Sequence, residues 1–155
     1  MASATLPLKN LILQRCTRHQ VQVTPLRETV LDMVLSHSGV IKAYQILAQL
    51  QALSEQAVAP PTAYRALDFW VEQGVLHKVA AVNGYVLCRH SCADCGQPGH
   101  SHRHAFILVC THCGQVNEQT LSQEWAALQA SLQRSGFGLD NEHVVLTGVC
   151  AQCQQ

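Results

Sequence analysis

Two Cys-x2-Cys motifs near the end of the chain are the residues best suited to chemistry. Cys110 and Cys113 form the first motif, and Cys150 and Cys153 form the second. One such motif holds a metal ion with both sulfurs, and two supply the four thiolates of a closed tetrahedral zinc site. Gly114 directly follows the first motif, where the chain needs a tight turn. The spacing therefore predicts a structural zinc ion held by all four cysteines.

The composition favours metal binding over redox chemistry. The 155 residues include eight Cys and nine His, an excess of soft metal ligands. A thioredoxin-like redox motif needs a βαβ context, which the sequence does not provide. The first residues lack the charged and then apolar pattern of a secretory signal, and no stretch approaches the ~20 apolar residues of a membrane span. We therefore expect a cytoplasmic protein with no membrane partner and with reduced or metal-bound thiols.

The charges are unevenly distributed although the net charge is zero. The first 27 residues contain no acidic side chain, and from residue 88 onward five acidic residues face three basic ones. The basic residues of the first segment are Lys9, Arg15, Arg18 and Arg27. This asymmetry suits an anion-binding module joined to a different second module.

Helical periodicity and capping signals predict four helices in the first half of the chain. The first covers 8–20, the second begins after Thr24, the third covers 43–53, and the fourth runs from Pro60 to Gly74. Thr24 is a good N-cap, and the proline after it loses no hydrogen bond at the first helical position. A proline likewise starts the fourth helix, and Gly74 ends it.

The fourth predicted helix has the composition of a helix that contacts DNA. Small and polar residues with one Arg and one Tyr occupy its first two turns, as the major groove requires. These outward-facing residues are Thr62, Tyr64, Arg65 and Asp68. Two short strands follow at 75–79 and 85–88, and the Asn-Gly pair at 83–84 predicts a hairpin turn between them. The pattern indicates a winged helix-turn-helix domain over residues 1–88, with a generic helical domain carrying a hairpin as the alternative.

The second half predicts a hinge followed by a small α/β domain, so the fold class is α+β. Residues 89–103 form the hinge, in which Cys92, Cys95, His100 and His102 are either an additional metal site or a polar linker. In residues 104–155 we expect a strand at 104–110, an antiparallel return at 115–118, a helix ending at Gly136 and a last strand at 143–149. One covering helix leaves apolar surface on so small a sheet, which a second copy of the chain would bury.

Several segments together resemble the ferric uptake regulator family. They are Val-Thr-Pro-Leu-Arg at 23–27, Pro-Pro-Thr-Ala-Tyr-Arg-Ala-Leu-Asp at 60–68, Gly-Val-Leu-His-Lys-Val at 74–79 and the two Cys-x2-Cys motifs. The resemblance covers nearly the whole chain and is strongest to the zinc uptake regulators within the family. It implies a homodimeric bacterial repressor of zinc uptake and homeostasis genes, with residues 104–155 as the dimerisation domain. Metal binding would then set the angle between the domains, so that two recognition helices fit a double-stranded DNA operator.

The resemblance also implies a regulatory zinc site at the hinge, and hence at least two zinc ions per chain. The ligand positions of the family fall on His77, Cys88, His104 and Glu118. The third ligand departs from the family pattern, because Arg103 stands where its histidine is expected. We therefore place that ligand at His104, with His102 as the alternative.

Three rival functions remain beside a zinc-responsive repressor. An iron- or peroxide-sensing member of the family would use more His and carboxylate ligands, whereas a thiolate favours zinc. A zinc-stabilised interaction module would not need Tyr64 and Arg65 at the head of a helix. A zinc enzyme needs an open coordination position and a general base, and the usual motifs for these do not occur. For a DNA-binding protein we predict base contacts from Arg65 and Tyr64 with Thr62 beside them. Phosphate contacts come from Arg15, Arg18 and Arg27.

Overall fold

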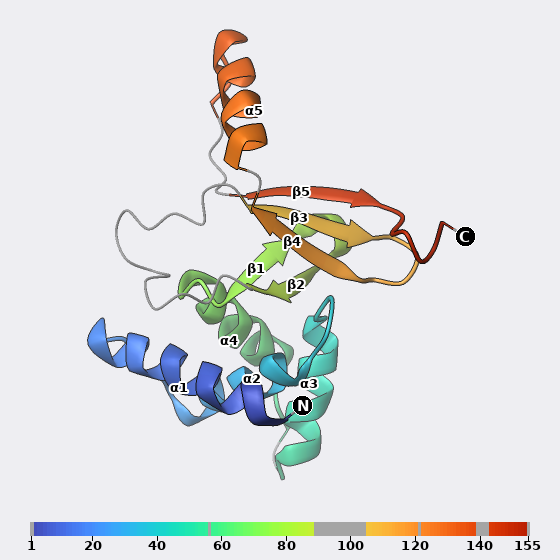
Figure 1. Ribbon diagram of the computed structural model, residues 1–155. Coiled ribbons are helices and arrows are strands. Elements are labelled where there is room, and N and C mark those ends of the chain that lie inside the picture. Colours follow the sequence, from blue (N-terminus) through green and yellow to red (C-terminus); the bar gives the residue numbers. More distant parts are fainter. Residues whose placement is uncertain (1, 56, 89–104, 121, 139–142, 155) are drawn as a thin grey trace. The chain divides into compact units, whose positions relative to one another are not determined.

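The computed structural model describes residues 2–55, 57–88, 105–120, 122–138 and 143–154. The chain divides into two compact units, Met1–Gly96 and Gln97–Gln155, which are considered separately (Figure 1). The predicted hinge and its candidate ligands Cys92, Cys95, His100, His102 and His104 lie outside the described residues.

Four helices make up most of what the structure describes of the first unit (Figure 1). They are α1 (Ala2–Arg18), α2 (Pro25–Ser36), α3 (Ala43–Leu53) and α4 (Pro60–Glu72). The last three begin where local signals predicted, and the side chain of Thr24 caps α2 by accepting from the Arg27 N–H at 3.4 Å. The predicted start of the first helix was wrong, since α1 already begins at residue 2 and contains Pro7, which is a helix breaker by intrinsic propensity.

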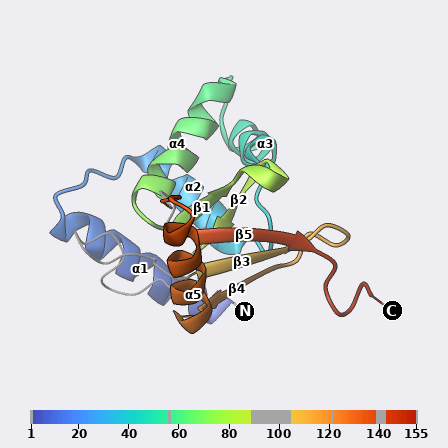
Figure 2. The same cartoon turned by 90° about the horizontal axis from the view of Figure 1, so that it is seen from above.

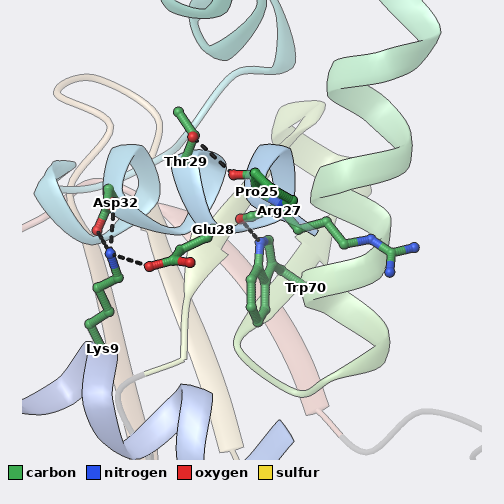
Figure 3. A network of polar contacts seen from close by, with 7 residues as sticks. All are labelled: Lys9, Pro25, Arg27, Glu28, Thr29, Asp32 and Trp70. Atoms are coloured by element: carbon green, nitrogen blue, oxygen red, sulfur yellow. Dashed lines mark hydrogen bonds and ion pairs between the residues drawn. The ribbon is translucent and has the colours of Figure 1, made fainter. Parts of the chain in front are cut away.

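Helices α2, α3 and α4 share one apolar core. Leu31, Ile46, Leu67 and Trp70 are among its largest fully buried side chains. The indole Nε1–H of Trp70 donates to the main-chain carbonyl of Arg27 at 2.9 Å, so this buried polar group has a partner (Figure 3). The bond fixes α4 directly to α2.

An ion-pair cluster joins α1 to α2. The Lys9 ammonium lies 2.8 Å from a carboxylate oxygen of Asp32 and 3.0 Å from Glu28 (Figure 3). The side chain of Lys9 is only 17% exposed, whereas both carboxylates reach solvent. The cluster therefore holds the first helix on the outside of the core.

The end of α4 redirects the chain into a hairpin. Gly74 has a φ of 68°, its N–H donates to Val71, and the N–H of Val75 donates to the Trp70 carbonyl. This pair of bonds is a Schellman motif, which ends a helix at a glycine. The chain then enters β1 (Leu76–Val79), as the sequence predicted.

The hairpin turn differs from the predicted two-residue turn. Between β1 and β2 (Gly84–Leu87) lies a 3-10 turn, η1 (Ala80–Val82), followed by Asn83 at a φ of 45°. Gly84 is the first residue of β2 and pairs with Val79. A Cβ on Gly84 would lie 2.5 Å from a methyl carbon of Val40. The glycine is therefore required by the close approach of another segment.

The described residues of the second unit form a three-stranded sheet and one helix. Its elements are β3 (Ala105–Cys110), β4 (Val116–Thr120), α5 (Ser122–Arg134) and β5 (His143–Gly148). Strand β3 is central, antiparallel to β4 and parallel to β5, and Figure 2 shows the three side by side. Parallel neighbours need a crossover, and α5 provides it.

We expected α5 to cover the sheet, and this expectation was wrong. The helix stands at the end of the sheet where β3 begins (Figures 1 and 2). Its buried anchor is Trp125, whose ring meets Phe106 edge-on with centroids 5.9 Å apart. Leu146 on β5 is 49% exposed, so apolar surface of the sheet is left open.

None of the described helices combines the length and the apolar character that crossing a bilayer requires.

Candidate metal centres and nucleic-acid face

The topology of the sheet brings the two Cys-x2-Cys motifs together. Cys110 ends β3, and the second motif follows β5 after Gly148, the residue paired with Cys110. Because β3 and β5 are parallel neighbours, both deliver their cysteines to the same end of the sheet. The four sulfur atoms lie within 4.8 Å of one another.

The spacing of the sulfurs fits a tetrahedral zinc ion. Cys113 Sγ and Cys150 Sγ are 3.8 Å apart. A tetrahedron with Zn–S bonds of about 2.3 Å has S–S edges of about 3.8 Å, whereas a disulfide requires about 2.05 Å. Gly114 adopts a φ of 71°, and its N–H donates to the Cys110 carbonyl at 3.0 Å to close the turn. The geometry therefore matches the zinc site predicted from spacing.

Hydrogen bonds give the Cys110 and Cys153 thiols unequal acidity. The backbone N–H groups of Cys113 and Cys150 point at the Cys110 sulfur and lower the pKa of Cys110 to about 6. Hydrogen bonds with the thiols of Cys150 and Cys113 raise the pKa of Cys153 to about 12. Near neutral pH these pKa values favour a thiolate at Cys110 and a protonated thiol at Cys153, so a bound cation is needed to hold both as thiolates.

His77 and Cys88 form a buried pair on the hairpin of the first unit. Their residues are 6% and 2% exposed. They do not lie directly opposite each other, because His77 pairs with Val86, and the Cys88 N–H donates to the Val75 carbonyl. They are therefore diagonal neighbours on one face, with a ring nitrogen and the Sγ within 4.8 Å. This distance suits two ligands of a single ion.

The other two predicted ligands of the regulatory site lie in the second half of the chain. Glu118 is half-buried on β4, paired with Ile107 of β3. His104, like its alternative His102, lies outside the described residues.

The start of α4 presents the side chains predicted to contact DNA. Tyr64 is 50% exposed, Arg65 is exposed and Thr62 is half-buried. Ala63 and Leu67 of the same helix are fully buried in the core. Burial of one side of the helix thus orients Tyr64 and Arg65 toward solvent.

The three arginines predicted to bind phosphates differ in their surroundings. Arg18 is exposed at the end of α1. The guanidinium of Arg27 stacks 3.8 Å from the centroid of the Phe69 ring and donates to the Gln22 carbonyl. Arg15 corrects our prediction, because it is only 5% exposed and donates to the carbonyl oxygen of Gln73. Its guanidinium is hydrogen-bonded inside the unit, so little of its surface is accessible to a phosphate.

Two features of this unit were missed in the sequence. Tyr44 is 68% exposed at the start of α3, and its position outside the apolar stripe of that helix was a usable signal. Lys42 precedes Tyr44 and donates to the carbonyl oxygens of Val82 and Asn83 in the hairpin turn. No local pattern indicates this second contact, since it joins residues about 40 positions apart.

The model of the ferric uptake regulator family matches residues 18–147. The chain belongs to the ferric uptake regulator family. Its sequence is 36% identical to that of the zinc uptake regulation protein of Escherichia coli (strain K12) over 138 residues. The match covers 89% of this chain and 76% of that protein.

Solved structures of related regulators share the fold of this family member. A zinc uptake regulator in complex with zinc and DNA is 34% identical, with a TM-score of 0.80 over 98% of this chain and 96% of that chain. Holo XcZur is 28% identical, with a TM-score of 0.72 over 94% of this chain and 98% of that chain.

Proposed function

We propose that the protein is a zinc-responsive, DNA-binding transcriptional repressor of zinc uptake and homeostasis genes. The buried His77–Cys88 pair carries the proposal, because it lies on the hairpin that directly follows the helix exposing Tyr64 and Arg65. The similarity to a zinc uptake regulation protein and to a regulator bound to zinc and DNA supports it. The protein would act in the cytoplasm, where DNA and reduced thiols coexist.

We assign two zinc sites to each chain. The first is the structural site of Cys110, Cys113, Cys150 and Cys153, whose geometry matches a closed tetrahedral centre. The second is a regulatory site with His77, Cys88 and Glu118 as ligands, completed by His104 or, failing that, His102. A thiolate beside an imidazole selects zinc over ferrous or manganous ions, which disfavours an iron- or peroxide-sensing role.

The second unit would form the homodimer through its sheet. Both β4 and β5 are edge strands in the described sheet, and Leu146 on β5 is half exposed. A groove of about 370 Å³ lies on this unit between Leu108, Leu146 and the cysteine cluster. Open strand edges and exposed apolar surface invite pairing with another chain. We therefore assign residues 104–155 to dimerisation, 1–88 to DNA binding and 89–103 to the hinge.

Zinc at the regulatory site would act by restricting the domains to one relative orientation. Two recognition helices of a dimer must lie about one helical turn of DNA apart, ~34–36 Å, to enter successive major grooves. Ligands drawn from both sides of the hinge, Cys88 before it and Glu118 after it, would select that orientation. By linkage, DNA must then tighten zinc binding by the same factor by which zinc tightens DNA binding.

At the DNA, Arg65 and Tyr64 would contact bases, with Thr62 beside them at the start of α4. Arg18 and Arg27 would contact phosphates, which fix the register without reading sequence. Arg15 drops out of this set because of its burial.

The test compares wild type with Cys88→Ser at buffered free zinc, on a duplex selected from random DNA by the zinc-loaded wild type. We expect Cys88→Ser to keep the structural zinc, the fold and the dimer but to lose zinc-dependent DNA binding. Cys16→Ser is the matched control, since Cys16 is equally buried in the same unit but has no ligand role. A full zinc response in Cys88→Ser would rule out the regulatory site. His104→Ala and His102→Ala, measured in parallel, identify the fourth ligand.

A further inference from the structure

An acidic residue on the exposed side of α4 connects that helix to the hairpin. One carboxylate oxygen of Asp68 accepts hydrogen bonds from the Lys78 ammonium at 3.0 Å and from the Tyr85 hydroxyl at 3.1 Å. Lys78 belongs to β1 and Tyr85 to β2. A single oxygen atom therefore joins the helix to both strands.

Tyr85 extends this connection to a third part of the domain. The residue is 3% exposed, and its backbone N–H and C=O exchange hydrogen bonds with Ile41 at 2.8 and 2.7 Å. Ile41 lies just before α3, and Lys78 is the register partner of Tyr85 with its ammonium 5.7 Å from the ring centroid. Asp68 thus fixes α4 to a residue that is itself locked to the hairpin and to the segment before α3.

We propose that Asp68 is a specificity-determining positioning residue, which sets the angle between α4 and the hairpin through the hydroxyl of Tyr85. The inference rests on the proposed DNA-binding function. Asp68 lies three residues after Arg65 on the same helix, so a tilt of α4 moves Arg65 with it. Asp68 itself need not touch a base.

Specific and non-specific binding differ in how much they depend on this angle. A bidentate contact between Arg65 and a base edge tolerates little displacement, because both hydrogen bonds must form together. Phosphate contacts are long-range and are available in many orientations. Loss of the positioning contact should therefore weaken binding to the selected sequence while leaving binding to arbitrary DNA nearly intact.

The charge of the cluster explains how a carboxylate is accommodated beside a DNA surface. An unpaired Asp68 would repel phosphates, but Lys78 neutralises it at hydrogen-bond distance. The hydrogen bond to Asp68 raises the pKa of Lys78 above its usual value, so the lysine stays charged. Together, Asp68 and Lys78 carry no net charge. The main contribution of Asp68 to DNA binding is therefore the positioning of α4.

The experiment measures affinity for the selected duplex and for random DNA with zinc saturating. Asp68→Ala and Tyr85→Phe should each weaken binding to the selected duplex about ten-fold, on the scale of one hydrogen bond. Tyr85→Phe, which keeps the charges of Asp68 and Lys78, should change binding to random DNA less than about two-fold, and Asp68→Ala should not weaken it, because it leaves the Lys78 charge unpaired. The double variant should be no weaker than Asp68→Ala alone, since both changes break one connection.

Conservative and distant variants separate positioning from general charge or stability effects. Asp68→Asn keeps an oxygen that accepts from the Tyr85 hydroxyl, so it should restore most of the discrimination. Asp32→Ala is the matched control, because Asp32 also pairs with a lysine but between α1 and α2, and it should leave the ratio of affinities unchanged (Figure 3).

Three results would each overturn the inference. The first is an equal loss of affinity for the selected duplex and for random DNA, and the second is an unchanged ratio of these affinities in Asp68→Ala. The third is a loss in the double variant that equals the sum of the two single losses. If Asp68→Ala fails to fold, the other two variants still test the inference. Discrimination between the selected duplex and random DNA must fall in Tyr85→Phe and persist in Asp68→Asn. If wild type itself selects no sequence, the proposed function fails and the inference with it.

Discussion

The guanidinium of Arg15 on α1 donates a hydrogen bond to the main-chain carbonyl oxygen of Gln73, the C-cap residue directly after α4. The carboxyl end of a helix carries a partial negative charge, so a cation is favourable there. Arg15 is 5% exposed, and such burial is costly for a charge unless it is hydrogen-bonded. The contact holds the first helix against the end of the helix that exposes Tyr64 and Arg65.

Removal of the Arg15 contact should destabilise the first unit. Arg15→Met keeps much of the apolar volume but leaves the Gln73 carbonyl without its charged donor, so we expect a loss of roughly 1.5–3 kcal/mol in the free energy of unfolding. Urea denaturation monitored by tryptophan fluorescence measures it. Arg18→Met is the control on the exposed side of α1 and should change stability by less than about 0.5 kcal/mol. Equal effects of the two changes would contradict the assigned role.

The cysteine cluster should supply the folding energy of the second unit. Structural zinc contributes on the order of 10 kcal/mol to small domains, so Cys113→Ser should lose this zinc and yield an unfolded or monomeric C-terminal half. Zinc content per chain and sedimentation velocity report the two effects. Cys16→Ser should retain both zinc and the dimer. A stable dimer of Cys113→Ser without zinc at the cluster would disprove the structural site.

Zinc binding at the cluster should weaken as the pH falls. The pKa of Cys110 is lowered to about 6, so without metal its ionised form contributes stability above the ordinary value of 9.0 that is lost as the pH falls through about 6. The pKa of Cys153 is raised to about 12, so its protonated form contributes stability below 9.0 that is lost as the pH rises toward 12. Zinc requires both as thiolates, and binding near neutral pH must therefore release the Cys153 proton.

Chelator competition between about pH 8 and about pH 5.5 should show this loss of zinc affinity. Calorimetry in buffers with different ionisation enthalpies counts the protons released. An affinity that does not change with pH, or binding without proton release, would contradict these thiol ionisations.

Arg65 should distinguish sequences, whereas Arg18 should not. A bidentate contact between Arg and guanine contributes roughly 1–3 kcal/mol of discrimination, so Arg65→Ala should weaken binding to the selected duplex more than binding to random DNA. Arg18→Ala should weaken both alike and reduce the slope of log affinity against log salt by about 0.9. Fluorescence anisotropy at several salt concentrations measures both quantities. Equal losses from Arg65→Ala on the two DNAs would make it a phosphate contact.

Local signals in the sequence determined most element boundaries and the candidate zinc ligands. Thr24 and Gly74 fix a helix start and a helix end through hydrogen bonds to residues within five positions. The two Cys-x2-Cys motifs predicted a shared zinc site, because the spacing within each motif allows both of its sulfurs to bind one ion. The order of strands around Cys110 then brought the motifs together.

Contacts between distant residues were decided only by the tertiary structure. Gly84 was predicted as a turn residue, but Val40, more than 40 positions earlier, requires its missing side chain. The sequence pattern around Arg15 is that of an exposed basic residue. Only the packing of α1 against the end of α4 buries it. Asp68 and Tyr85 meet for the same reason. Sequence patterns encode period and local hydrogen bonding, whereas these contacts depend on how elements pack in three dimensions.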